Sequence, residues 1–139
     1  MTAAGCKYPG FISYSHRDRK VAEWLHRAIE SYRVPKRLIG SPGAHGPVPA
    51  RLYPIFRDRE ELPASGDLSA ELSAALRQSK FLIVICSPAS ARSRWVNEEI
   101  LEFKRVHGDG RVLGVVADGE PMASEMPGRE AEECFPLAL

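Results

Sequence analysis

The sequence predicts an α/β fold of the flavodoxin-like kind, with a doubly wound parallel sheet covered by helices on both faces. Four short apolar segments alternate along the chain with three segments of helical periodicity. Strands that alternate with helices require crossover connections, and these produce a parallel sheet. The segment 81–86, FLIVIC, is continuously apolar, which is typical of a strand buried on both faces at the centre of such a sheet.

Size and composition indicate one globular domain. The 139 residues are 44% apolar and 27% charged, and a chain of this length buries roughly two-thirds of the surface that it exposes when unfolded. We therefore expect a short lead over residues 1–8 and a single domain over 9–139, whose part after about residue 119 is irregular because Gly119, Pro121 and Pro127 interrupt it.

Charge and hydropathy exclude several classes of function. The net charge of +1 is spread along the chain, so no basic stripe predicts nucleic-acid binding. No run approaches the roughly 18 apolar residues of a membrane span, and the first residues lack the apolar core of a secretory signal. We expect a cytoplasmic protein without membrane contact. Three separated cysteines predict neither disulfides nor a zinc site.

The first half of the chain contains two predicted strands and one predicted helix. Residues 10–15, GFISYS, form the first strand, and Asp18 is the predicted N-cap of a helix that ends before Pro35. The predicted buried stripe of this helix contains Val21, Trp24, Leu25, Ala28, Ile29 and Tyr32. Residues 40–49 are rich in Gly and Pro and predict a loop, and residues 51–56 predict the second strand.

The second half continues the alternation. Asp67 is the predicted N-cap of a helix with an apolar stripe, and strand 81–86 follows it. After a short loop of small residues, a helix is predicted over 93–106 and a fourth strand over 111–117. The buried side of this third helix is predicted to contain Val96, Ile100 and Phe103.

Polar residues end or directly follow the predicted strands at their carboxyl ends, where ligands bind in open parallel sheets. These residues are Tyr14, Ser15, Arg57, Asp58 and Ser87. An aromatic ring suits stacking on a base, a hydroxyl suits a ribose or phosphate, and arginine suits a pyrophosphate. The third helix begins at this same edge of the sheet, so we expect its first turns to face the same crevice.

Four motifs in this order resemble a Toll/interleukin-1 receptor (TIR) domain. They are FISYS, FRDREEL followed by Gly66, SP at Ser87, and SRWVNEE at the start of the third helix. The resemblance covers about residues 9–118 and is closest to bacterial TIR proteins that hydrolyse NAD. The sequence departs from the family in two places. No fifth strand or closing helix is predicted after Gly119, and the loop over 40–49 is long.

The resemblance implies an NAD glycohydrolase with Glu99 as the catalytic residue. In TIR enzymes a glutamate follows a tryptophan by four residues, and Trp95 and Glu99 have this spacing. The implied role of Glu99 is to contact the ribose on the nicotinamide side and to stabilise an oxocarbenium-like transition state. Trp95 either lines the substrate or seats the helix. Without the resemblance, the pattern alone favours Glu99 as a solvated helix carboxylate over a catalytic residue.

The resemblance also implies that the loop from Arg57 to Gly66, the BB loop of the family, covers the nucleotide site and mediates self-association. The products would be nicotinamide and ADP-ribose or a cyclic isomer, in antiphage defence or NAD depletion. The sequence has neither GxGxxG nor GxxxxGK[ST], so NAD is expected as a substrate, with no cofactor and no metal.

Two other functions stay open at the level of sequence. One is a non-catalytic module that only binds other TIR domains. The other is a receiver-like domain phosphorylated on Asp58, which is disfavoured because Ser15 and His16 stand where an acidic pair is expected.

Overall fold

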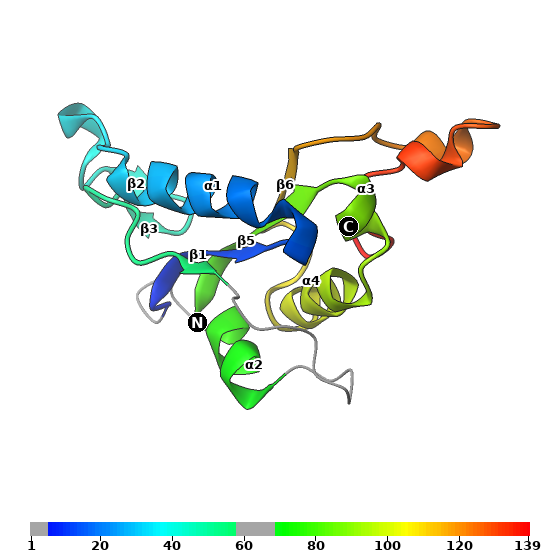
Figure 1. Cartoon of the computed structure of the whole chain (residues 1–139). Coiled ribbons are helices and arrows are strands. Elements are labelled where there is room, and N and C mark those ends of the chain that lie inside the picture. The colour runs from blue at the N-terminus through cyan, green and yellow to red at the C-terminus, as the bar shows by residue number, and fades with distance from the viewer. Residues whose placement is uncertain (1–5, 58–68) are drawn as a thin grey trace.

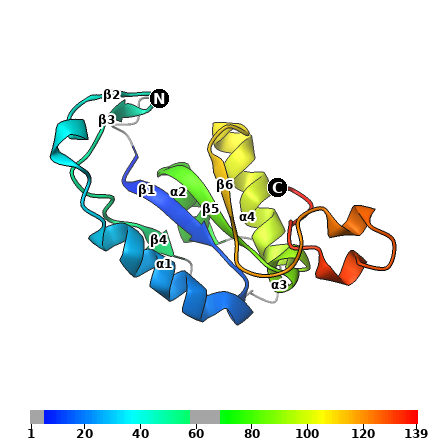
Figure 2. The same cartoon turned by 90° about the horizontal axis from the view of Figure 1, so that it is seen from above.

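The computed structural model describes residues 6–57 and 69–139 of the chain. Its main sheet has four strands in the order β4-β1-β5-β6, and all neighbouring strands are parallel (Figures 1 and 2). The strands are β1 (Tyr8–Ser13), β4 (Phe56–Arg57), β5 (Ser79–Cys86) and β6 (Val112–Val116). The predicted doubly wound parallel sheet is therefore confirmed.

Helices cover both faces of the sheet (Figure 1). One face packs on α1 (Arg19–Ser31), and the opposite face packs on α2 (Ala70–Arg77) and α4 (Arg94–His107). A single turn, α3 (Pro88–Ala91), follows β5 where the sequence predicted a loop. Because β5 lies between β1 and β6 under both layers, it is buried along most of its length, as its apolar run predicted.

Serine side chains begin three of these helices. Ser69 accepts a hydrogen bond from the Leu72 amide at 3.2 Å, and Ser93 accepts one from the Val96 amide at 3.2 Å. The predicted N-cap Asp67 is therefore wrong for α2, which begins two residues later, and Asp67 itself lies outside the described residues. Ser87 caps α3 with a reciprocal bond to Ser90.

The segment before β4 differs from the predicted strand over 51–56. Only Phe56 and Arg57 pair with β1, because Pro54 has no amide hydrogen to donate and the Ile55 amide donates to the Glu30 side chain instead, at 2.8 Å. The second strand is thus shorter than predicted and ends one residue later.

The region predicted as a loop over 40–49 contains a small antiparallel hairpin, so that prediction was incomplete. The hairpin pairs β2 (Pro42–Gly43) with β3 (Gly46–Pro47) and lies near the start of β1 (Figure 2). A 3-10 turn, η3 (Lys36–Leu38), precedes it.

The buried stripe of α1 is narrower than predicted. Ala22 is fully buried, and Leu25 and Ile29 pack against the core on this face. Val21 and Trp24 are exposed, and Tyr32, which follows the helix directly, is exposed as well. These three residues therefore do not belong to the buried stripe. Asp18 occupies the N-cap position after a 3-10 turn, η2 (His16–Asp18), but its carboxylate does not cap the helix.

The last part of the chain is irregular. After β6 it forms two 3-10 turns, η4 (Ala123–Glu125) and η5 (Glu130–Glu132), and returns to α4. The Ala138 amide donates to Asn97 Oδ1 at 2.7 Å, and Lys104 Nζ donates to the Ala138 carbonyl at 2.6 Å. In the described part, no helix is both long and apolar enough to cross a bilayer.

Candidate functional site

Glu99 lies in the second turn of α4 with its side chain directed at the end of β1. The Ser13 hydroxyl donates a hydrogen bond of 2.7 Å to Glu99 Oε1. Both residues are fully buried. A carboxylate that no solvent reaches is costly unless hydrogen bonds satisfy it, so this contact is a structural requirement as well as a feature of the site.

The alternation of β1 explains why Ser13 reaches Glu99. Phe11 belongs to the core cluster shared with α4, and Ile12 belongs to the cluster shared with α1. Since successive side chains of a strand point to opposite faces, Ser13 faces α4. The sequence contained this signal, but pairing Ser13 with Glu99 required knowledge of how α4 packs across the sheet.

Trp95 lies one turn before Glu99 on the same helix. It is 7% exposed and is part of the core cluster on the α4 face. In this position Trp95 packs α4 against the sheet. A contact between Trp95 and substrate stays a prediction.

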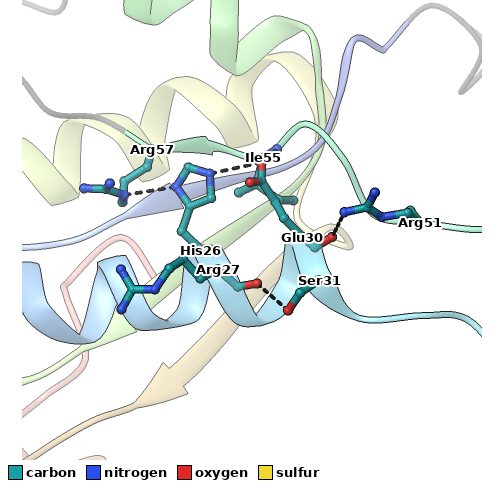
Figure 3. Close-up of polar contacts among 7 residues, drawn as sticks. All are labelled: His26, Arg27, Glu30, Ser31, Arg51, Ile55 and Arg57. Atoms are coloured by element: carbon teal, nitrogen blue, oxygen red, sulfur yellow. Dashed lines mark hydrogen bonds and ion pairs between the residues drawn. The ribbon is translucent and has the colours of Figure 1, made fainter.

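Arg57 is held on the other face of the sheet. Its Nε donates to His26 Nδ1 at 3.0 Å, and His26 Nε2 lies 3.1 Å from Glu30 Oε2 (Figure 3). Because His26 and Glu30 belong to α1, the Arg57 side chain is separated from Glu99 by the sheet. Asp58 and the rest of the loop to Gly66 lie outside the described residues.

Tyr14 and Ser15 follow β1 directly. Tyr14 is half-buried and packs against the α1-side core, whereas Ser15 is half-buried and accepts from the Arg17 amide at 3.4 Å at the start of η2. Tyr14 is therefore on the same face as the Arg57 side chain, opposite to Glu99.

Ser87 joins the end of β5 to the start of α1. It is 2% exposed, and its hydroxyl donates to Asp18 Oδ2 at 2.5 Å. The structure thus brings Ser87 to the predicted edge of the sheet, where its hydroxyl binds Asp18. Asp18 was predicted only as a helix cap.

Comparison with known proteins identifies the family. The model of the Thoeris protein ThsB, TIR-like domain, matches residues 11–121. The chain belongs to the TIR-like domain family. The match includes both partners of the Ser13–Glu99 hydrogen bond.

This TIR-like domain is similar to a curated protein in sequence and to a solved structure in fold. It is 36% identical over 115 residues to a protein of an Actinoplanes species named NAD(+) hydrolase ApTIR, and these residues are 82% of this chain but 14% of the relative. It also resembles the TIR domains of the activated Roq1 resistosome directly recognizing the pathogen effector XopQ. That likeness has a TM-score of 0.51 at 24% identity, covers 79% of this chain and 56% of the other, and supports the fold alone.

Among the described residues, an apolar cavity and a buried cysteine stand apart from the site around Glu99. An apolar cavity of about 380 Å³ lies at the opposite edge of the sheet, lined by the starts of β1 and β5 and by the hairpin, and it includes none of the predicted site residues. Burial raises the pKa of the Cys86 thiol to about 11, so this cysteine stays protonated at neutral pH and is a core residue.

The arrangement around Glu99 suits the stabilisation of positive charge. The carboxylate is attached to a packed helix, and its Oε1 is oriented by a hydroxyl at the end of a strand that has neighbours on both sides. A preorganised carboxylate in a site without solvent interacts with a developing cation more strongly than one in water.

Proposed function

We propose that this TIR-like domain is an NAD glycohydrolase with Glu99 as its catalytic residue. The observation that carries the proposal is the Glu99 carboxylate, buried and oriented by Ser13 at the carboxyl end of β1. The relative named NAD(+) hydrolase ApTIR supports it. The proposed biological role of this activity is antiphage defence or NAD depletion.

The proposed reaction breaks the bond between ribose C1′ and the nicotinamide nitrogen. Nicotinamide leaves as a neutral ring and takes the bonding electron pair, which leaves positive charge on the ribose. The Glu99 carboxylate stabilises this charge. Water then attacks C1′ and loses a proton, giving ADP-ribose, or an adenine nitrogen attacks C1′ and gives a cyclic isomer. Because the leaving group is already cationic in NAD, no general acid is needed.

The remaining substrate contacts are proposed from residue type and position. Tyr14, Ser15 and Ser87 follow strand ends at one edge of the sheet, and Trp95 lies one helical turn from Glu99. Asp58 follows Arg57 in the sequence and is proposed from its residue type alone. Arg57 uses Nε to bind His26, and its terminal N–H groups have the planar geometry that a pyrophosphate requires.

Self-association is part of the proposal. Glu99 is inaccessible to solvent, so NAD can contact it only after a local opening. We propose that contacts between copies, including the loop from Arg57 to Gly66, favour the open arrangement. Activity should then rise more steeply than linearly with protein concentration.

The burial of Glu99 also favours the second candidate function, a non-catalytic module that binds other TIR domains. In that case the Ser13–Glu99 hydrogen bond only stabilises the core. The two functions differ in one observable, which is nicotinamide release.

The experiment follows nicotinamide release from NAD by the wild-type domain, dilute and concentrated. The test variant is Glu99→Gln, which keeps the size of the side chain and an acceptor for Ser13. The matched control is Glu98→Gln, because Glu98 is the adjacent glutamate of α4 and is half-buried rather than fully buried. Circular dichroism establishes that each variant folds.

We expect release by the wild type and the Glu98→Gln variant, and a loss of at least about 100-fold for Glu99→Gln. Equal release by both variants would exclude Glu99 as the catalytic residue. Absence of release at every concentration, with self-association intact, would support the non-catalytic module.

A further inference from the structure

The Ser13 hydroxyl has a role beyond satisfying a buried acceptor. We infer that Ser13 is a positioning residue, whose hydrogen bond fixes the rotation of the Glu99 carboxylate that the ribose cation meets. This inference rests on the proposed glycohydrolase function. Ser13 was not among the predicted site residues, and its contact with Glu99 is defined by the 2.7 Å bond between two fully buried side chains.

Geometry makes Ser13 suited to this task. Glutamate has several rotatable bonds, and its terminal torsion is broad, so the position of its backbone alone does not fix the carboxylate. Ser13 has a short side chain at the end of β1, which has β4 on one side and β5 on the other. The donor therefore has little freedom. A distance of 2.7 Å is ordinary for an O–H···O hydrogen bond.

The expected consequence is a loss in turnover rather than in substrate binding. Ser13 acts through Glu99, so removing its hydroxyl leaves the groups that bind NAD unchanged. A misplacement of about 1 Å at a reacting group lowers the rate by up to about 100-fold. We expect Ser13→Ala to lower kcat by about 10- to 100-fold while KM stays within about twofold.

The experiment compares a graded series at position 13. Ser13→Thr keeps the hydroxyl, Ser13→Cys replaces it with a weak donor of similar size, and Ser13→Ala removes the donor. The order of kcat should be wild type, then threonine, then cysteine, then alanine. Recovery by Ser13→Thr to within about threefold of the wild type is expected if the hydroxyl is what matters.

Ser79→Ala is the matched control. Ser79 is also fully buried at a strand of the main sheet, and its hydroxyl also donates at 2.7 Å, but to the Ala75 carbonyl of α2. Losing this bond should lower stability by a comparable amount and leave kcat unchanged. Urea unfolding of each variant separates the effect on stability from the effect on turnover.

The outcomes separate this inference from the proposed function. Release by the wild type together with an unchanged kcat for Ser13→Ala would overturn the inference and leave the glycohydrolase proposal standing. An equal loss of kcat in Ser79→Ala would also overturn it, because the effect would then follow stability. Should Ser13→Ala fail to fold, the kcat values of the wild type, Ser13→Thr and Ser13→Cys test the inference. Equal kcat values for all three would overturn it. Absence of release by the wild type would overturn both proposals.

Discussion

Ser13, Ser79 and Ser87 are buried, and each hydroxyl donates to an acceptor on a different element of the fold. Polar groups in a core are costly unless they are paired. Each serine therefore fixes the position of its partner as well as satisfying its own hydroxyl. In this small domain, the hydroxyls connect β1 to α4, β5 to α2, and the end of β5 to the start of α1.

Substitution of Ser87 tests the strength of such a connection. Ser87→Ala removes the cap of α3 and the donor to Asp18. Loss of a helix cap costs about 1 kcal/mol, and loss of a hydrogen bond to a carboxylate adds to it. We expect the free energy of unfolding to fall by about 1–3 kcal/mol, as measured by urea denaturation.

The control for Ser87 is Ser31→Ala. Ser31 is exposed at the end of α1, where its hydroxyl donates to the Arg27 carbonyl at 2.7 Å. Its removal should change stability by less than about 0.5 kcal/mol. If the two variants lose the same stability, the Ser87–Asp18 bond does not contribute to holding β5 and α1 together.

At the scale of elements, α1 supports the end of β4 through side chains. The strand has only two residues, so few backbone hydrogen bonds hold it. Glu30 accepts the Ile55 amide at 2.8 Å and lies beside His26, and His26 accepts from Arg57 at 3.0 Å (Figure 3). The position of Arg57 therefore depends on α1 as much as on the sheet.

Glu30→Ala should loosen this end of the sheet. The Ile55 residue is 5% exposed, so its amide would lose its acceptor where water has little access. The expected loss of stability is about 1–3 kcal/mol, and Glu30→Gln should recover part of it because the amide oxygen still accepts. Urea unfolding measures both variants. The matched control is Glu23→Ala on the same helix. Glu23 contacts Arg19 at 3.9 Å between exposed side chains, so its loss should lower the free energy of unfolding by less than about 0.5 kcal/mol. A loss of stability as large as that of Glu30→Ala would contradict the role of the Glu30 bond.

The elements that could be predicted from sequence are those whose hydrophobic pattern lies within the element itself. The apolar run of β5 and the periodicity of α4 identified the sheet centre and the helix of Glu99. The short β4 could not be predicted, because the Ile55 amide donates to Glu30, which is 25 residues away. The same limit applies to the site. Trp95 and Glu99 share one helix, and the resemblance to TIR enzymes identified them because their spacing matches the pattern of that family. Ser13 is 86 residues from Glu99 and is its partner only through the packing of α4 on β1.

At the scale of the whole molecule, β6 leaves one side of the sheet open within the described residues. Leu82 donates to the Arg111 carbonyl and Ala117 donates to the Cys86 carbonyl, so residues 111 and 117 face β5. By alternation, the amides and carbonyls of residues 112, 114 and 116 point outward. The strand, VLGVV, contains neither a charge nor a proline, and these are the usual features that prevent pairing with another chain.

We therefore expect this chain to self-associate at high concentration through the open side of β6. Leu113→Lys places a charge on this strand, and the concentration needed for association should rise about tenfold or more, as measured by sedimentation equilibrium. Leu101→Lys is the matched control, because both leucines are 49% exposed but Leu101 lies on α4. Association that weakens equally in both variants would indicate non-specific apolar contact, and association that weakens in neither would exclude the β6 edge. A selective loss in Leu113→Lys would show that the edge strand carries the contact between copies.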